Sequence, residues 1–195
     1  RKLAKYLPPQ IWGSLFSGKR DAKLETRRKR LTVFFSDIAG FTDLTDRLEA
    51  EAVSEVLYRY LSEMSAIADG CGGTIDKFIG DGIMIFFGDT GARGAEEDTS
   101  ACVAMALQMR DQFRCLSDRW QMSHGGAALH LRIGIHCGYC LVGHFGCAER
   151  RDYTALGSTV NLASRLEGYA GQDEILVSQE VIRMLGPRLG VSPRG

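Results

Sequence analysis

A short apolar hairpin constrains the fold of this chain more than any other stretch of its sequence. The segments GTIDKFI and GIMIFFG meet at Gly80-Asp81-Gly82. A link this short, with glycine on both sides of an aspartate, predicts a tight turn between two strands. The two strands are therefore expected to be antiparallel neighbours, with Asp81 at the tip of the turn.

A second strand-like segment ends in an acidic residue. LTVFFSDIAGF, residues 31–41, begins with buried-type apolar side chains, and Asp37 follows them directly. Burying an unpaired carboxylate would cost several kcal/mol. Asp37 is therefore expected at an edge of the sheet, beside a cation, a metal ion or backbone N–H groups.

The other elements alternate between helices and strands. Apolar residues three and four positions apart predict an amphipathic helix ending near Gly70, and a second helix is predicted from Glu96 to Leu116. The stretch LHLRIGIHCGYCLVGHFG predicts two strands separated at Gly138 and Gly143. A helix entered near Ser158 and a last strand, EILVS, follow. This order predicts an α+β sandwich, an antiparallel-rich sheet covered by helices.

Composition is that of an ordinary globular protein of one domain. The 195 residues are 45% hydrophobic and 25% charged, with 24 basic and 24 acidic residues. Because these charges balance, no overall field recruits nucleic acid, and we expect no nucleic-acid partner. The lone basic run RRKR is interpreted as a solvated joint. GSLFSGKR has the spacing of a phosphate-binding loop, but Arg20 stands where a hydroxyl should hold magnesium, so we interpret it as coincidence.

The ends of the chain differ from its middle. We expect residues 1–30 to be a linker from an upstream regulatory region, residues 31–186 to form the folded domain, and residues 187–195 to be a flexible tail. The sequence has no initiator methionine, no signal peptide and no apolar run of roughly 18 residues. We therefore expect an excised fragment that lies in the cytoplasm, and whether its parent is anchored in a membrane is left open.

Cysteine and histidine residues gather between positions 136 and 147. Cys137 and Cys140 have the spacing of half a zinc ribbon, but no second Cys-x-x-Cys accompanies them. Residues three apart in a strand point to opposite faces, so these two thiols are not expected to converge. Buried, reduced cysteine is the preferred interpretation, and it fits a reducing compartment.

The two aspartates could form one site if their strands are neighbours. Asp37 and Asp81 would then meet at one edge of the sheet, beside the Ile38-Ala39-Gly40 loop that leads into a helix. Two carboxylates form a weak magnesium site that phosphate oxygens would complete, and a loop entering a helix offers N–H donors to those phosphates. The alternative is that one aspartate caps a helix and the other makes a turn.

Four blocks of the sequence resemble the class III nucleotidyl cyclases. They are FSDIAGFT, DKFIGDGIMIFFG, LRIGIHCG and DYTALGSTVNLASRLE, in family order and at family-like separations. The resemblance runs from about Leu31 to Leu185, which makes residues 31–186 a cyclase catalytic domain. It implies a ferredoxin-like core, a head-to-tail homodimer with shared active sites, and conversion of a nucleoside triphosphate to a 3′,5′-cyclic nucleotide and pyrophosphate.

The same resemblance implies roles for individual residues. Asp37 and Asp81 fall on the metal-binding aspartates, with the Ile38 carbonyl as a further ligand, and each active site would hold two Mg²⁺ or Mn²⁺ ions. Backbone groups of Ile38, Gly40 and Phe41 would bind the substrate phosphates. The remaining expected site residues are Lys77 and Thr154, which would read the purine, and Asn161 and Arg165, which would orient the ribose and stabilise charge on the reacting phosphate.

Thr154 departs from the best-known adenylyl cyclases, many of which have aspartate at this position. A threonine hydroxyl can accept a hydrogen bond from an adenine amino group but can also donate one, so weaker discrimination against guanine is expected. Lys77 argues against a guanylyl enzyme, in which the family usually places glutamate. We therefore expect an adenylyl cyclase acting on ATP, similar to a bacterial-type subclass in which bicarbonate responsiveness occurs. A guanylyl cyclase and a non-catalytic cyclase-like domain remain the alternatives.

Overall fold

The computed structural model describes residues 26–46, 48–124, 128–147, 151–186, 190 and 192–193. Most of the predicted linker and of the predicted flexible tail lies outside the described residues, as does the GSLFSGKR segment. No helix in the described ranges is both long enough and apolar enough to cross a membrane.

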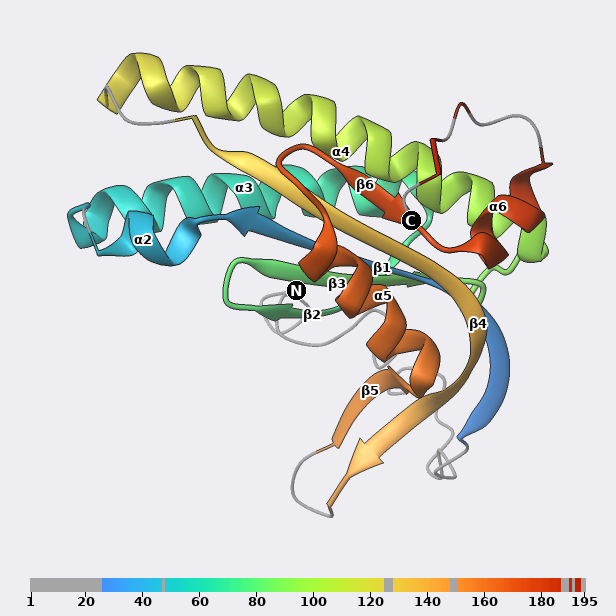
Figure 1. The fold of residues 1–195 in the computed structure, drawn as a ribbon. Coiled ribbons are helices and arrows are strands. Elements are labelled where there is room, and N and C mark those ends of the chain that lie inside the picture. The colour runs from blue at the N-terminus through green and yellow to red at the C-terminus, as the bar shows by residue number, and fades with distance from the viewer. Residues whose placement is uncertain are drawn as a thin grey trace.

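One mixed sheet organises the described part of the chain (Figure 1). Its strands run in the order β2-β3-β1-β4-β5, every pair along this path is antiparallel, and the short β6 pairs in parallel with β4. The strands are β1 (Arg27–Ala39), β2 (Thr74–Ile79), β3 (Gly82–Phe87), β4 (His130–Gly146), β5 (Arg151–Leu156) and β6 (Ile175–Val177).

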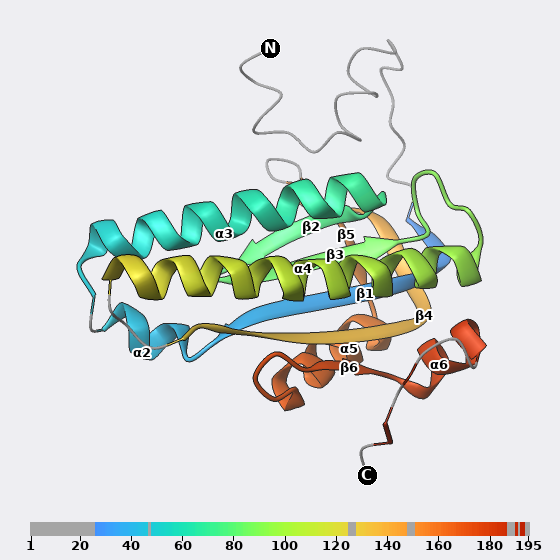
Figure 2. The ribbon, with the colours of Figure 1, turned by 90° about the horizontal axis from the view of Figure 1, so that it is seen from above.

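Helices cover both faces of the sheet. Figure 2 shows α3 and α4 side by side over one face, with α5 on the opposite face. Helix α6 packs against α4 and β4. The helices are α2 (Phe41–Thr45), α3 (Ala50–Cys71), α4 (Ala95–His124), α5 (Ser158–Tyr169) and α6 (Gln179–Leu185). The predicted α+β sandwich is confirmed.

Two apolar clusters follow from the two faces of the strands. Successive strand residues point to opposite faces, so Phe34 and Ile38 of β1 join the large cluster under α3 and α4. Leu31 and Val33 join a smaller cluster that includes Ala163 of α5. Strands buried on both faces account for the near-continuous apolar runs of β1 and β3.

Strand β1 begins before residue 31, where the folded domain was expected to start. The strand already begins at Arg27, which pairs with Val142 of β4. Lys29 Nζ lies 2.6 Å from a carboxylate oxygen of the buried Asp89, and the Arg28 guanidinium lies 4.9 Å from the centroid of the Tyr139 ring. The basic run RRKR was interpreted as a solvated joint because its charges suggest exposure, but these partners make it part of the sheet.

The prediction of two strands within residues 129–146 is wrong. Residues 130–146 form the single long strand β4, whose second half curves away from α3 and α4 in Figure 1 and carries β5 with it. Gly138 does not end the strand, since it pairs with Leu31. Glycine is required there for packing, because a Cβ atom on Gly138 would lie 2.5 Å from the Thr159 hydroxyl of α5. Helix α4 also extends beyond its predicted end, to His124.

Cys137 and Cys140 lie on opposite sides of the sheet. Cys137 belongs to the large apolar cluster and Cys140 to the small one. Their thiols therefore do not converge, as expected for residues three apart in a strand. No group of three or more metal-binding side chains occurs within the described ranges.

Candidate active site

Asp37 and Asp81 meet where β1 runs past the β2–β3 turn. Ser36 pairs with Ile83 of β3, so Asp37 lies beside the turn that carries Asp81. The Ile38 backbone N–H donates to Asp81 Oδ2 over 3.0 Å. The predicted meeting of the two carboxylates is confirmed as geometry, because antiparallel pairing of β1 with β3 brings the end of one strand to the start of the other.

The closely spaced carboxyl groups of Asp37 and Asp81 favour the binding of a cation. Burial, together with the adjacent Asp37 carboxylate, raises the pKa of Asp81 to about 7. A cation between the two groups would offset both the repulsion from Asp37 and the cost of ionising a buried carboxyl group. Their oxygen donors and half-buried position suit a hard divalent ion such as Mg²⁺, so the residues fit the metal site that the sequence predicts.

Arg132 completes this cluster, although it was not among the residues predicted from the sequence. Its Nη2 lies 2.5 Å from Asp37 Oδ2, and its Nε lies 3.4 Å from Glu167 Oε1 on α5. Arg132 sits directly opposite Asp37 in the β1–β4 ladder. Only that register joins the two residues, so no pattern local to LRIGIHCG could have revealed the contact.

The loop after Asp37 enters the short helix α2. Gly40 has a φ of 73° and is the N-cap residue of that helix. The Phe41 side chain is buried in the large apolar cluster, so only its backbone remains to bind a ligand. The structure thus places Ile38, Gly40 and Phe41 beside the acidic pair, and their role in substrate binding stays a prediction.

Lys77 and Thr154 come together from opposite ends of the strand order. Lys77 lies on β2 and Thr154 on β5, and the curvature of β4 returns β5 to the side of β2. Asp76 joins them: Thr154 Oγ1 donates to Asp76 Oδ2 over 2.6 Å, and Lys77 Nζ lies 3.9 Å from Asp76 Oδ1. Asp76 was not predicted as a site residue, because neither its spacing nor its neighbours distinguish it in the sequence.

Asn161 and Arg165 lie one turn apart on α5, and both are exposed. Within the described residues, neither side chain makes a hydrogen bond or ion pair with Asp37 or Asp81. One chain therefore assembles the acidic cluster and the Lys77–Asp76–Thr154 cluster, and it presents Asn161 and Arg165 on a helix surface.

The family of this chain is settled by its sequence. The sequence model of the adenylate and guanylate cyclase catalytic domain matches residues 24–195. The chain belongs to this family. The resemblance to the class III nucleotidyl cyclases, inferred above from four blocks, is confirmed.

Named relatives of this cyclase domain include both base specificities. An adenylate cyclase of Anabaena cylindrica is 35% identical over 162 residues, which are 80% of this chain and 31% of that protein. The crystal structure of the adenylyl cyclase CyaB from P. aeruginosa is 52% identical, with a TM-score of 0.81, over 83% of this chain and 82% of that one. The guanylyl cyclase Cya2 is 32% identical, with a TM-score of 0.79, over 87% and 88%. Because both specificities share the fold, base choice must lie in the side chains.

The cyclase domain is short beside its curated relatives. It spans 31%, 21% and 7% of the length of three adenylate cyclases that it matches. Most of the length of those proteins therefore lies outside the part that this chain matches.

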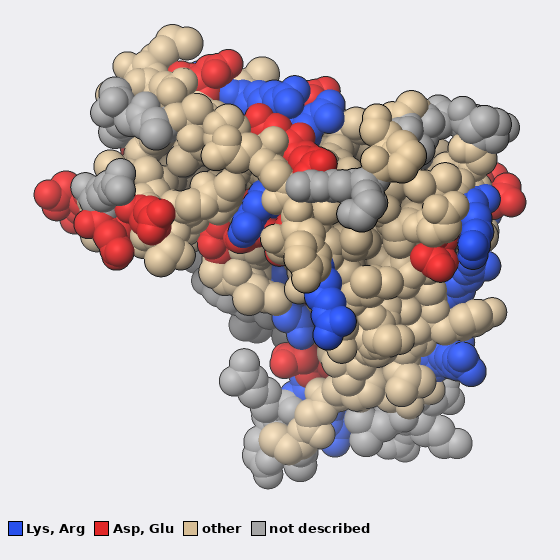
Figure 3. All heavy atoms as spheres, viewed as in Figure 1, with Lys and Arg blue, Asp and Glu red and all other residues tan. Residues whose placement is uncertain are grey.

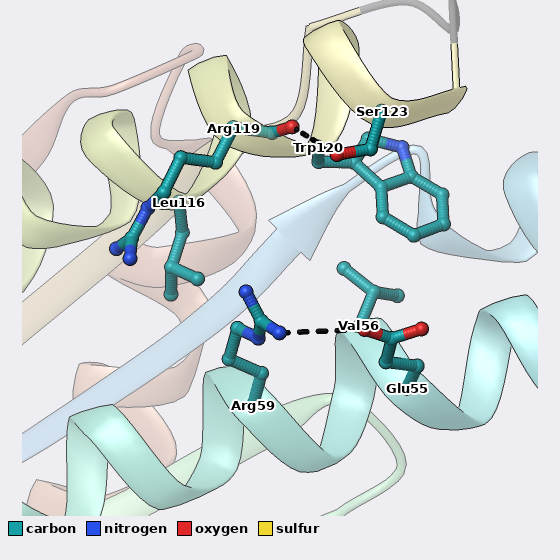
Figure 4. Close-up of a pocket in the computed structure, with 7 residues that line it drawn as sticks. All are labelled: Glu55, Val56, Arg59, Leu116, Arg119, Trp120 and Ser123. Carbon is teal, nitrogen blue, oxygen red and sulfur yellow. Dashed lines mark hydrogen bonds and ion pairs between the residues drawn. The ribbon is translucent and has the colours of Figure 1, made fainter.

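Among the described residues, the face drawn in Figure 3 has no large area of a single charge. Figure 3 shows small acidic and basic groups around a broad area of other residues, in keeping with the balanced charge of the chain. Figure 4 shows a pocket between α3 and α4, which includes none of the predicted site residues. It is lined by Glu55, Val56, Arg59, Leu116, Arg119, Trp120 and Ser123.

Proposed function

We propose that this cyclase domain converts ATP to 3′,5′-cyclic AMP and pyrophosphate, with two divalent metal ions in each active site of a homodimer. One observation carries the proposal: Asp37 and Asp81 meet at an edge of the sheet, where burial and the proximity of Asp37 raise the pKa of Asp81 to about 7. Such a pair has a strong electrostatic reason to take up a cation at neutral pH.

The reaction is an internal displacement on ATP. The ribose 3′-oxygen forms a bond to the α-phosphorus, the bond from that phosphorus to the oxygen bridging to the β-phosphate breaks, and the 3′-hydroxyl proton is released. Held by Asp37, Asp81 and the Ile38 carbonyl, divalent ions would supply Lewis-acid activation of the 3′-hydroxyl and neutralise the leaving pyrophosphate. The protein positions the substrate and supplies the charged groups around it.

Arg132 is suited to the triphosphate. Its guanidinium pairs with Asp37, and a cation bound to Asp37 would compete for that carboxylate. Arginine binds phosphate oxygens through a rigid fork of donors. We therefore assign Arg132 to the phosphates, in addition to the backbone of Gly40 and Phe41.

Asn161 and Arg165 supply the remaining groups. Their i and i+4 positions place an amide and a guanidinium on one exposed face of α5. The amide orients the ribose, and the guanidinium stabilises charge that grows on the reacting phosphate. Because no contact between described residues links them to the acidic pair of their own chain, they are proposed to serve the acidic pair of a partner chain.

Lys77 and Thr154 favour adenine. A lysine donates to N1 of adenine, which is an acceptor, whereas N1 of guanine carries a hydrogen. The guanylyl alternative is kept because Cya2, a guanylyl cyclase, shares the fold at 32% identity. The non-catalytic alternative is disfavoured, because Asp37, Asp81, Asn161 and Arg165 are all present.

The proposed setting is a larger signalling protein in the cytoplasm, with this domain controlled by an upstream regulatory region. The greater length of the curated relatives supports further segments. All six cysteines are free in the structure, which suits a reducing compartment.

A product assay tests the proposed function. The purified chain is incubated with ATP or GTP and either Mg²⁺ or Mn²⁺, and the products are identified by chromatography and mass spectrometry. Cyclic AMP with an equal amount of pyrophosphate is expected. Cyclic GMP in excess would favour a guanylyl cyclase, and no cyclic product with either nucleotide, from folded dimeric protein, would favour a non-catalytic domain.

A further inference from the structure

Asp76 is a buried carboxylate between the two side chains that are proposed to read the purine. Only 1% of its side chain is exposed. Its oxygens divide between two partners: Oδ2 accepts from the Thr154 hydroxyl over 2.6 Å, and Oδ1 lies 3.9 Å from Lys77 Nζ. The proposed reaction assigns no step to this group.

A β-bulge explains how neighbours in sequence come to share a cluster. In the β2–β3 ladder, Ile75 pairs with Ile85 and Lys77 pairs with Met84, which leaves Asp76 as the extra residue. In a regular strand Asp76 and Lys77 would point to opposite faces. The bulge re-aims one side chain, and both then reach the same carboxylate-centred cluster.

The contact decides which way the Thr154 hydroxyl donates. A carboxylate has only acceptor sites, so the single hydrogen of the hydroxyl is used in the bond to Asp76. The other acceptor within reach is the Ala155 carbonyl, at 3.5 Å, which is a much longer contact. The Thr154 oxygen keeps only lone pairs for any other partner.

Burial and hydrogen bonding act on Asp76 in opposite directions. Burial and the nearby Asp152 carboxylate raise the pKa of its carboxyl group, whereas the Thr154 hydroxyl, the Lys77 ammonium and the Ala155 backbone N–H lower it, and the net shift is upward. The Thr154 hydroxyl therefore stabilises the ionised form of Asp76, and Asp76 in turn fixes the direction in which that hydroxyl donates. The contribution of Lys77 is weak, because its side chain is 42% exposed.

An acceptor at position 154 distinguishes the two purines. Adenine presents a 6-amino donor, whereas guanine presents a 6-oxo acceptor at the same place. A hydroxyl free to rotate would serve both bases, as expected above from the sequence. A hydroxyl fixed by Asp76 accepts from adenine and meets the guanine oxygen with a lone pair.

We propose that Asp76 is a positioning residue that makes Thr154 a hydrogen-bond acceptor only, and that it thereby selects ATP over GTP. This rests on the proposed reading of the base by Lys77 and Thr154. Because the Asp76 side chain is buried and accepts from the Thr154 hydroxyl, it acts through that hydroxyl.

The test compares ATP with GTP in the variant Asp76→Asn. An amide carries both an acceptor and donors, so Thr154 regains the freedom to donate. We expect the ratio of kcat/KM for ATP to that for GTP to fall by about tenfold or more. A merely structural effect would lower both values together and leave the ratio unchanged.

Three further variants test whether Asp76 acts through the Thr154 hydroxyl. Asp118→Asn removes an exposed acid on α4, in neither of the two clusters, and should leave the ratio at the wild-type value. Thr154→Val removes the hydroxyl and should also lower the ratio. The double variant Asp76→Asn/Thr154→Val should be no less selective than Thr154→Val alone, because Asp76 has then lost the group through which it acts.

The outcomes separate this inference from the proposed function. If the wild type forms no cyclic AMP, the proposed function fails. If the wild type prefers ATP and the folded Asp76→Asn variant keeps the wild-type ratio, the role of Asp76 is wrong. Should Asp76→Asn fail to fold, NMR of the wild-type protein decides: a slowly exchanging Thr154 hydroxyl proton supports the fixed hydroxyl, and rapid exchange overturns it.

Discussion

Arg132 Nη2 lies 2.5 Å from Asp37 Oδ2, directly across the ladder between β4 and β1. The fold thus supplies its own cation to one of the two acids in the candidate metal site. Asp81 has no such partner among the described residues, and burial beside Asp37 raises its pKa to about 7. A divalent ion would therefore be attracted most strongly by Asp81. By also binding Asp37, it would release Arg132 to bind a phosphate.

Removing either metal-site acid should abolish cyclisation while the fold remains. For Asp37→Ala or Asp81→Ala we expect activity with Mg²⁺ or Mn²⁺ to fall by more than about a hundredfold, because the cations that activate the 3′-hydroxyl lose a ligand. Arg132 stays partly exposed and keeps Glu167 as a partner, so folding should survive. Activity assays with circular dichroism as the check on folding measure both effects.

Asp69→Asn is the matched control for the two metal-site variants. Asp69 is an exposed acid on α3, and its change should leave activity unaltered. Near-normal activity in both Asp37→Ala and Asp81→Ala would contradict the two-metal mechanism.

Mixing two inactive variants should restore activity if each site is shared between chains. Asp37→Ala and Asn161→Ala are each expected to be inactive alone, but a mixed dimer places one intact acidic pair opposite one intact α5 surface. With free exchange, half of the dimers are mixed and each holds one working site of two. Activity should then reach about a quarter of the wild-type value per chain.

Chain exchange is verified by co-purifying two differently tagged variants. If exchange occurs and activity stays at the level of the separate variants, the shared site is wrong. Mixing Asp37→Ala with Asp81→Ala provides the control, because both changes affect the same half of each site and no recovery is expected.

Asp173 should stabilise the domain only above acidic pH. Its Oδ2 lies 3.0 Å from His130 Nδ1, and its Oδ1 accepts from the Leu131 N–H over 3.2 Å. Although burial raises the pKa of Asp173, these hydrogen bonds outweigh it and hold the pKa below its usual value. A carboxyl group with a lowered folded-state pKa stabilises the fold above its unfolded pKa of about 3.9, and that contribution is lost as pH falls through the folded pKa.

The variant Asp173→Asn tests this pH dependence. Its φ of 57° suits asparagine, so backbone strain should not contribute. We expect the free energy of unfolding in urea to drop by about 1–2 kcal/mol at pH 7, with the difference from wild type shrinking below about pH 4. Asp118→Asn, at an exposed position on α4, should show no such loss. A deficit that stays constant down to about pH 3.5, below the unfolded pKa, would refute the electrostatic explanation.

Gly134 should be intolerant of alanine because α5 packs directly on it. A Cβ atom there would lie 2.1 Å from the Glu167 backbone nitrogen and 2.4 Å from the Ala163 carbonyl oxygen. Backbone atoms cannot rotate away, so Gly134→Ala should cost about 3 kcal/mol or more, or prevent folding. Urea unfolding of Gly168→Ala is the comparison: that glycine is in α5 with no atom near its Cβ position, and alanine should be neutral or stabilising by up to about 1 kcal/mol. Equal stability of the two variants would disprove the close packing.

Local patterns in the sequence predicted the elements and part of the site. The hairpin around Asp81, the amphipathic helix α3 and the opposed thiols depend on residues near one another or on strand periodicity. The meeting of Asp37 with Asp81 was predicted only on the condition that β1 and β3 are neighbours. The four motif blocks also pointed to the cyclase family, because each block is a continuous run of residues that needs no knowledge of strand pairing. The roles assigned to Lys77, Thr154, Asn161 and Arg165 remain predictions for the assays above.

Strand register and sheet curvature decided the rest. RRKR looked like a solvated joint until the ladder placed it in β1. Strand β4 looked like two strands because Gly138 and Gly143 were interpreted as breaks, whereas Gly138 is required by the packing of α5, which lies further along the chain. The Arg132–Asp37 and Asp76–Thr154 contacts join residues separated by 95 and 78 positions. Sequence determined which segments become strands and helices, because propensity and periodicity are local. Tertiary structure alone decided which charges face one another, because that depends on pairing between distant strands.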